Sequence, residues 1–103
     1  MNTKAKGSRN ERKVRDILRG EGWLVIKAGA SLGLWDLVAL HPDRPKPCLV
    51  QVKSNRKPPT KELAALNKFA CHHPFTECYY VVVKDRQTPL WTPVPTSLER
   101  VDD

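Results

Sequence analysis

Leu49-Val50-Gln51-Val52-Lys53 is a run in which two polar side chains interrupt the pattern of a buried strand. Side chains two apart on a strand point to the same face of a sheet. Leu49, Gln51 and Lys53 therefore share one face, and Val50 and Val52 share the other. Because burying an amide and an amine costs free energy, their presence in such a strand indicates a functional site.

A second apolar run, at residues 34–40, precedes this strand and carries one carboxylate, Asp36. The connector between the two runs is rich in proline and other turn formers, so the runs are expected to pair as an antiparallel hairpin. Folding the chain in this connector places Asp36 opposite residues 51–53, and directly opposed residues share a face. The sequence does not determine the register of the two strands to better than one residue, so either Gln51 or Lys53 stands beside Asp36. An acid, an amide and an amine are predicted to converge.

The composition indicates one globular domain with a strongly basic balance. The 103 residues suit a single core, and 40% hydrophobic with 28% charged residues argues against disorder. Lys and Arg number 18 against 11 Asp and Glu, and the net charge of +7 favours a polyanionic partner, with nucleic acid as the first candidate. No apolar run approaches the roughly 18 residues of a membrane span, so no membrane partner is expected.

The cysteines Cys48, Cys71 and Cys78 are odd in number and lack the spacing of a disulfide framework. They fit small buried residues in a reducing compartment, so we expect a cytoplasmic protein, in the host cytoplasm if the chain is viral. The alternative is a zinc site formed by Cys71, His72, His73 and Cys78. The missing Cys-x-x-Cys pair and the adjacent histidines argue against zinc.

The first helix is predicted to begin at Ser8, because Ser8 to Glu11 matches a capping box, and to end at Gly20 or Gly22. Residues 1–7 before it are expected to form a basic, flexible arm. At 3.6 residues per turn, Glu11 lies on the apolar stripe of this helix, whereas most of its basic residues face solvent. The alternative for Glu11 is a reciprocal cap that bonds to Ser8.

The remaining patterns complete the order of elements. They predict a strand at residues 23–26, a glycine-containing connection at 28–33, a helix capped by Thr60, a strand at 78–83 and a proline-bounded edge strand at 89–94. The tail at residues 95–103 is expected to be peripheral. The second helix must carry the chain back to a sheet that the hairpin began, so we predict an α/β fold with a mixed central sheet flanked by helices.

In this order the motifs resemble the archaeal-type Holliday junction resolvases, which belong to the PD-(D/E)xK nuclease superfamily. The resemblance rests on Lys6-Gly7-Ser8-Arg9 with Glu11, the segment 28–31, Asp36 ahead of apolar residues, and Gln51-Val52-Lys53 before a basic loop and a helix. It implies a restriction-endonuclease-like core of order α-β-β-β-α-β-β, formed by one nuclease-like domain over residues 1–103. It also implies a homodimer that hydrolyses phosphodiester bonds of four-way or other branched DNA with a divalent metal.

The resemblance implies roles for individual residues. Glu11, Asp36, Gln51 and the main-chain carbonyl of Val52 would hold Mg²⁺ or Mn²⁺. Lys53 would orient or deprotonate the attacking water and offset the charge that develops at phosphorus. Ser31 is a further catalytic candidate, with a turn residue as its alternative. Contacts with flanking phosphates would come from the basic residues Lys6, Arg9, Arg12, Arg56 and Lys57.

Two positions depart from the pattern of the superfamily. Trp35 stands where the motif has proline, and Gln51 stands where it has glutamate or aspartate, which removes one negative charge. Two alternatives therefore stay open. Asp36 and Lys53 could form only a partly buried ion pair with Gln51 as a spacer. The chain could also be a DNA-binding module that keeps the nuclease fold without cleaving.

Overall fold

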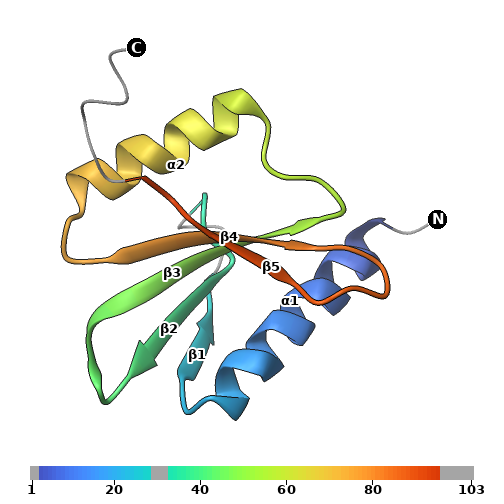
Figure 1. Ribbon diagram of the computed structural model, residues 1–103, viewed down its shortest axis with the longest axis horizontal. Helices are drawn as coiled ribbons and strands as arrows, with labels where there is room; N and C mark the ends of the chain where they lie inside the picture. The colour runs from blue at the N-terminus through green and yellow to red at the C-terminus, as the bar shows by residue number, and fades with distance from the viewer. Residues whose placement is uncertain (1–2, 29–32, 96–103) are drawn as a thin grey trace.

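The computed structural model has a five-stranded mixed sheet with one helix on each face (Figure 1). The structure describes residues 3–28 and 33–95, without the side chains of residues 3–6. Its elements are α1 (Thr3–Gly20), β1 (Leu24–Lys27), β2 (Leu37–His41), β3 (Arg44–Ser54), α2 (Thr60–His72), β4 (Glu77–Val83) and β5 (Leu90–Pro93). This order confirms the predicted α/β fold.

The strands lie side by side in chain order, and only one neighbouring pair is parallel. Strands β3 and β4 run in the same direction because α2 crosses back over the sheet between them, and the other three pairs are antiparallel. Leu37 pairs with Val50, and Asp36, one residue before β2, bonds to Val50 and Val52, the two neighbours of Gln51. The pairing therefore selects one of the two registers left open by the sequence pattern.

The hairpin between β2 and β3 is tighter than its proline-rich sequence predicted. Only Pro42 and Asp43 form the turn, and β3 already begins at Arg44. The pairing shifts between Ala39 and His41, so residues 45–47 are accommodated as a bulge. Prolines 45 and 47 can lie in a strand because a bulge does not require their missing N–H groups.

Helix α1 begins earlier than the capping pattern predicted. It starts at Thr3, so Ser8 lies inside the helix and is not its N-cap, and residues 3–7 of the expected arm are helical. Alanine and lysine are strong helix formers, and one internal glycine costs only about 1 kcal/mol, so the helix extends past the capping motif. Its predicted end is confirmed, because α1 stops at Gly20 and Gly22 takes a φ of +95°.

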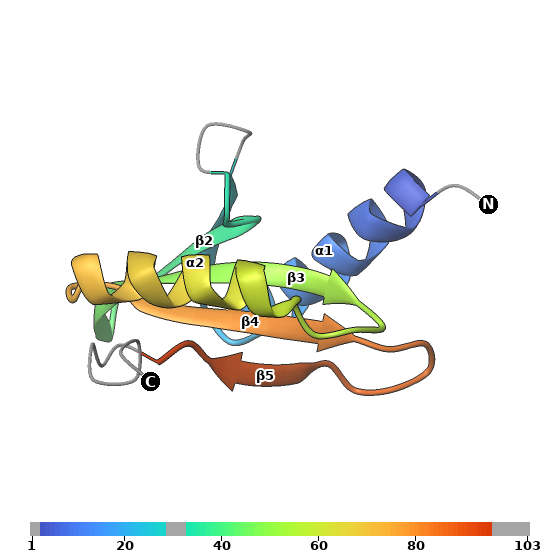
Figure 2. The same ribbon diagram turned by 90° about the horizontal axis from the view of Figure 1, so that it is seen from above.

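Helix α2 lies along β3 and β4 on the face opposite α1 (Figure 2). Its first residue is Thr60, and its N-cap is Pro59, which makes no side-chain cap bond. The prediction that Thr60 would be the cap is therefore wrong by one residue. Its apolar face packs on the sheet, since Leu66 and Ala70 are buried there.

Each face of the sheet has its own hydrophobic core, and β3 contributes to both. Val50 packs on the α1 side with Val14, whereas Leu49 packs on the α2 side with Leu66. Trp35 fills the α2-side core against Phe69, with ring centroids 5.4 Å apart. The sequence pattern predicted that Gln51 shares a face with Leu49, and the structure shows that this face is the one covered by α2.

Candidate active site

The site forms where β2 begins and β3 ends. Asp36 lies just before β2, and Gln51 and Lys53 belong to the last residues of β3. Helix α1 brings Glu11 to this place from one face, and α2 brings Glu62 from the other. The predicted convergence of an acid, an amide and an amine is therefore present in the structure.

Asp36 is bonded to the backbone on both sides. Its amide N donates to the Val50 carbonyl at 2.9 Å, and its carbonyl accepts from the Ala28 amide at 2.9 Å. The Val52 amide N donates to Asp36 Oδ2 at 2.7 Å, which fixes the side chain against β3. Burial raises the pKa of the Asp36 carboxyl above its usual value, although the Val52 amide and Lys53 act in the opposite direction. Oδ1 is the carboxylate oxygen that Val52 leaves available.

Within the described residues, the buried amide of Gln51 is hydrogen-bonded at its nitrogen and not at its oxygen. It is only 5% exposed, and its Nε2 donates to the Leu34 carbonyl oxygen at 3.1 Å and to Glu62 Oε1 at 2.6 Å. Both partners are pure acceptors, so the nitrogen of the amide must face them. Its Oε1 is buried and has no hydrogen-bond partner among the described residues. An unsatisfied buried acceptor costs about 1–3 kcal/mol, so it requires an explanation such as a ligand.

Lys53 forms its close ion pair with Glu62, not with Asp36. The Lys53 Nζ lies 2.6 Å from Glu62 Oε1, and both side chains are about one-third exposed. This contact argues against the alternative in which Asp36 and Lys53 are only each other's partners. Sequence reasoning missed Glu62, because acidic residues are common in the first turn of helices, where the helix dipole alone favours a negative charge.

Glu11 faces the site from α1. The pKa of its carboxyl is raised by burial and by the nearby charge of Asp36, and Lys27, at 3.9 Å, lowers it. Ser8 lies within the helix, so the capping alternative for Glu11 is excluded. Glu11 lines a hollow of about 170 Å³ together with Arg12 and Lys27. Glu11 is the one proposed metal ligand among the residues that line this hollow.

The basic residues predicted to contact DNA flank this site on two elements. Arg9 and Arg12 are exposed on α1, and Arg56 and Lys57 are exposed in the loop after β3. Ser31 lies outside the described residues, and so does the side chain of Lys6. The fold adds a group that sequence reasoning missed. A hollow of about 270 Å³ has four basic residues and one acid among its lining residues: Arg9, Lys13, Lys84, Arg86 and Asp85.

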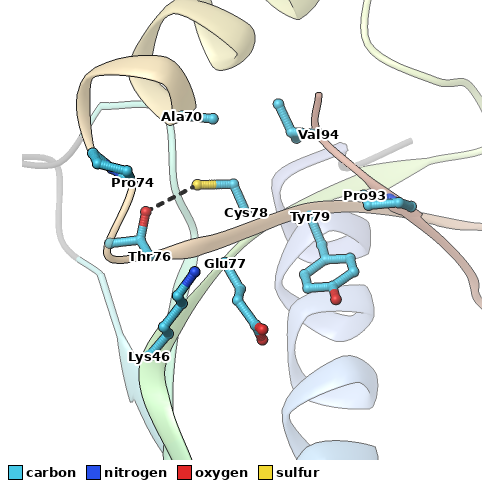
Figure 3. A pocket seen from close by; sticks show the side chains of 9 residues that line it. All are labelled: Lys46, Ala70, Pro74, Thr76, Glu77, Cys78, Tyr79, Pro93 and Val94. Carbon is cyan, nitrogen blue, oxygen red and sulfur yellow. Dashed lines mark hydrogen bonds between the residues drawn. The ribbon is translucent and has the colours of Figure 1, made fainter. Parts of the chain in front are cut away.

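The larger hollow shown in Figure 3, of about 480 Å³, lies at the other end of the sheet. It is lined by residues where β3 and β4 begin, among them Lys46 and Glu77, and Figure 3 shows the Thr76 hydroxyl directed at the Cys78 sulfur, 3.4 Å away. Parallel strands begin at the same edge, so this hollow is remote from the ends of β3 where the candidate site lies. The predicted site residues do not line it.

The structure also tests the alternative zinc site. Cys71, His72, His73 and Cys78 are all described, and no group of three or more His, Cys, Asp or Glu side chains in the described chain is placed to hold a metal. In the described residues, these four side chains are therefore not brought together as a set of metal ligands. Cys48 and Cys78 are buried, as predicted, whereas Cys71, also expected to be buried, is only partly so. Burial raises the pKa of the Cys48 thiol to about 12. A metal at the candidate site would need a mixed set of carboxylate, amide and carbonyl oxygens.

Residues 2–103 match a family model described as archaeal Holliday junction resolvase (hjc). The chain belongs to this family. The solved structure of Archaeoglobus fulgidus Hjc, a Holliday junction resolvase from an archaeal hyperthermophile, is similar at 26% sequence identity with a TM-score of 0.67, over 86% of this chain and 73% of that one. A search of curated proteins finds no significant match.

Family membership makes the chain a resolvase-type endodeoxyribonuclease, which confirms the resemblance read from the motifs. Its DNA-processing class also agrees with the net charge of +7. In the part of the chain that the structure describes, no helix combines the length and the apolar character needed to cross a bilayer. DNA is therefore the partner around which the site must be interpreted.

Proposed function

We propose that this resolvase cleaves four-way or other branched DNA by metal-dependent hydrolysis of a phosphodiester at the site of Asp36, Gln51 and Lys53. The observation that carries the proposal is the unpartnered Oε1 of Gln51. A buried amide oxygen, in a residue whose two neighbours both bond to Asp36, suits a hard cation, which prefers oxygen ligands. The amide therefore supplies a ligand in the place where related nucleases have an acid.

The residues present fit Mg²⁺ or Mn²⁺. Asp36, the Gln51 amide oxygen and the Val52 carbonyl would hold the ion, with Glu11 as a further ligand or as the acceptor of a coordinated water. When bound, the ion supplies a Lewis acid for the phosphoryl oxygens and lowers the pKa of water. The raised pKa values of Glu11 and Asp36 agree with this assignment, because burial first, and then a neighbouring carboxylate (Asp36 beside Glu11, Glu62 beside Asp36), disfavours the charged form that a bound cation would stabilise.

Lys53 acts on the attacking water and on the charge that develops at phosphorus. Its ammonium lies on the same face of β3 as Gln51, so it faces a phosphate held at Asp36 and Gln51. A positive group placed before the reaction begins stabilises a developing negative charge without reorganisation. Glu62 holds the ammonium in place through the 2.6 Å ion pair.

We expect the exposed bases around the site to position DNA without reading its sequence. Replacing Arg9, Arg12, Arg56 or Lys57 by alanine should weaken junction binding similarly for all sequences, and each change should reduce the salt slope of the binding constant by about one. Binding measured over a series of salt concentrations tests this. A loss that depends on base sequence would instead identify a residue that contacts bases.

We also expect the resolvase to act as a homodimer. A junction has paired strands to cut and each chain offers one site, so a two-fold dimer matches the symmetry of the substrate. Leu24, Ile26 and Leu40 support this, because they stay exposed on the face of β1 and β2 opposite α1. Sedimentation should show a dimer, and Ile26→Lys should weaken it. A monomer both free and with junction DNA would contradict the expectation.

The function itself is tested by incubating the purified protein with labelled four-way junction, flap, duplex and single-stranded DNA in Mg²⁺, Mn²⁺ or EDTA. Metal-dependent cleavage that prefers branched DNA is the expected result. Junction binding without cleavage in either metal would favour the alternative, a DNA-binding module that has lost cleavage through Gln51.

A further inference from the structure

One carboxylate oxygen links α2 to both polar residues at the end of β3. Glu62 Oε1 accepts a hydrogen bond from Gln51 Nε2 at 2.6 Å and lies 2.6 Å from Lys53 Nζ. Glu62 is itself only partly exposed, at 27% of its side chain. No motif of the sequence pointed to this residue, and the proposed function gives it no contact with metal or DNA.

We propose that Glu62 is a positioning residue, which orients the amide of Gln51 so that a glutamine can serve as a metal ligand in place of an acid. The proposal rests on the proposed function. A carboxylate at position 51 would offer oxygen in either orientation, but an amide presents oxygen at only one end. Glu62 binds the nitrogen end and thereby leaves Oε1 for the cation.

Two acceptors hold the nitrogen end, and Glu62 is the stronger one. A charged acceptor makes a shorter and stronger hydrogen bond than a neutral carbonyl, which agrees with 2.6 Å to Glu62 against 3.1 Å to Leu34. Donation to a carboxylate also polarises the amide, so its oxygen becomes a better ligand. The Glu62 contact thus compensates in part for the ligand strength that is lost when position 51 carries an amide in place of an acid.

Glu62 also supplies a negative charge to the site, where position 51 carries an uncharged amide. The surroundings of Asp36 include the carboxylates of Glu11 and Glu62 and the ammonium groups of Lys27 and Lys53. Three carboxylates against two lysines leave a net negative charge, even though the whole chain carries +7. Pairing with Glu62 also keeps the Lys53 ammonium from neutralising Asp36 at close range, so the carboxylate stays available to a cation.

Magnesium binding by the full chain without DNA tests the proposal, with calorimetry as the readout. Loss of groups that orient a metal ligand lowers affinity by about 10- to 100-fold, and we expect Glu62→Ala to weaken Mg²⁺ binding by at least tenfold. Glu77→Ala is the matched control, because Glu77 is also partly exposed and ion-paired, to Arg44 at 3.1 Å, at the other end of the sheet. An unchanged affinity in folded Glu62→Ala protein would overturn the proposal.

A second readout follows the Gln51 side-chain amide by NMR. In the parent chain Mg²⁺ should shift this signal, whereas in Glu62→Ala the signal should lose its single, hydrogen-bonded position before any metal is added. A merely structural role for Glu62 would lower the melting temperature and leave the Gln51 signal and its response to Mg²⁺ unchanged. That combination would also overturn the proposal.

The exchange variant Gln51→Glu with Glu62→Gln separates positioning from charge. Gln51→Glu alone sets two carboxylates against each other and should lower the melting temperature in EDTA, whereas the exchange lets the new amide at 62 donate to the new carboxylate at 51. The double variant should therefore be more stable than the sum of the single changes predicts. Additive effects would contradict a direct bond between the two positions.

The outcomes also separate this proposal from the function on which it rests. A parent chain that cuts junctions in Mg²⁺, with normal Mg²⁺ affinity in Glu62→Ala, overturns the positioning role alone. A parent chain that neither binds Mg²⁺ nor cuts overturns the proposed function, and the Glu62 to Gln51 contact is then judged by the exchange variant in EDTA.

Discussion

Asp36→Asn should lower the rate of junction cleavage by more than about 100-fold, because loss of a group that only supports a metal ligand already costs about 10- to 100-fold in affinity or activity. Asparagine has the same shape and keeps an oxygen that can accept from the Val52 amide, so the backbone contact at 2.7 Å survives. What the variant removes is the charge. Junction binding should be largely unchanged, because it depends on the exposed bases.

Cleavage rates and junction affinities of the purified variant provide the measurement. Asp43→Asn is the matched control, since Asp43 lies in the β2–β3 turn with its side chain 88% exposed. Normal cleavage by Asp36→Asn would show that the site is wrongly assigned. A parallel loss of junction binding would show that Asp36 organises the DNA surface and does not act through a cation.

The same variant should be more stable than the parent in EDTA at neutral pH. Burial raises the pKa of Asp36 above the usual 3.8, so the folded chain binds this proton more tightly than the unfolded chain. The stability from this proton is complete below the unfolded pKa and is lost as the pH rises through the folded pKa. The gain of the variant should therefore be largest at neutral pH and shrink toward acid pH. Equal melting temperatures of Asp36→Asn and the parent across the pH range would contradict this expected gain in stability.

Lys53→Ala should lower the rate constant for cleavage at saturating Mg²⁺ by about 100- to 10,000-fold, the range for losing a group that acts on a transferred proton. Mg²⁺ affinity should not fall, because removing a positive charge beside Asp36 favours a cation. This result would distinguish the role of Lys53 from that of Asp36, because loss of the Asp36 carboxylate should raise the Mg²⁺ concentration needed for half-maximal cleavage. Single-turnover cleavage over a range of Mg²⁺ concentrations distinguishes the two.

Lys46→Ala is the control for this measurement, since Lys46 is an exposed lysine near the beginning of the same strand. It should cleave like the parent. If Lys53→Ala cleaves normally, the ion pair with Glu62 is only structural. If it cleaves slowly but also binds Mg²⁺ more weakly, Lys53 supports the metal ligands and does not act on the water.

The pattern of apolar residues predicted the elements because local periodicity reflects which side of each element is buried. Alternation in β3 placed Leu49 and Val50 on opposite faces, and the structure confirms this. Local signals were weaker at the ends of elements. Ser8 matched a capping box, yet α1 extends back to Thr3, because helix-forming residues precede the motif and a cap is only a modest preference.

The candidate site was partly visible in the sequence for a related reason. A carboxylate, an amide and an amine in apolar strands are conspicuous, and a hairpin brings neighbouring strands together whatever the rest of the fold does. The pairing of Leu37 with Val50 then decided which polar residue stands beside Asp36. A register depends on the turn and on the bulge at residues 45–47, which the proline-rich connector did not reveal.

The sequence alone determined the class of the fold, the polyanionic partner and the polar residues of β3, because these follow from composition and periodicity. Only the tertiary structure brought Glu62 to Gln51 and Lys53, and Lys84 and Arg86 to Arg9. The first group joins α2 to β3 through contacts, and the second lines one hollow between α1 and the β4–β5 loop. They depend on how helices cross the sheet, and no local pattern encodes that geometry because each segment alone satisfies its own periodicity in many arrangements.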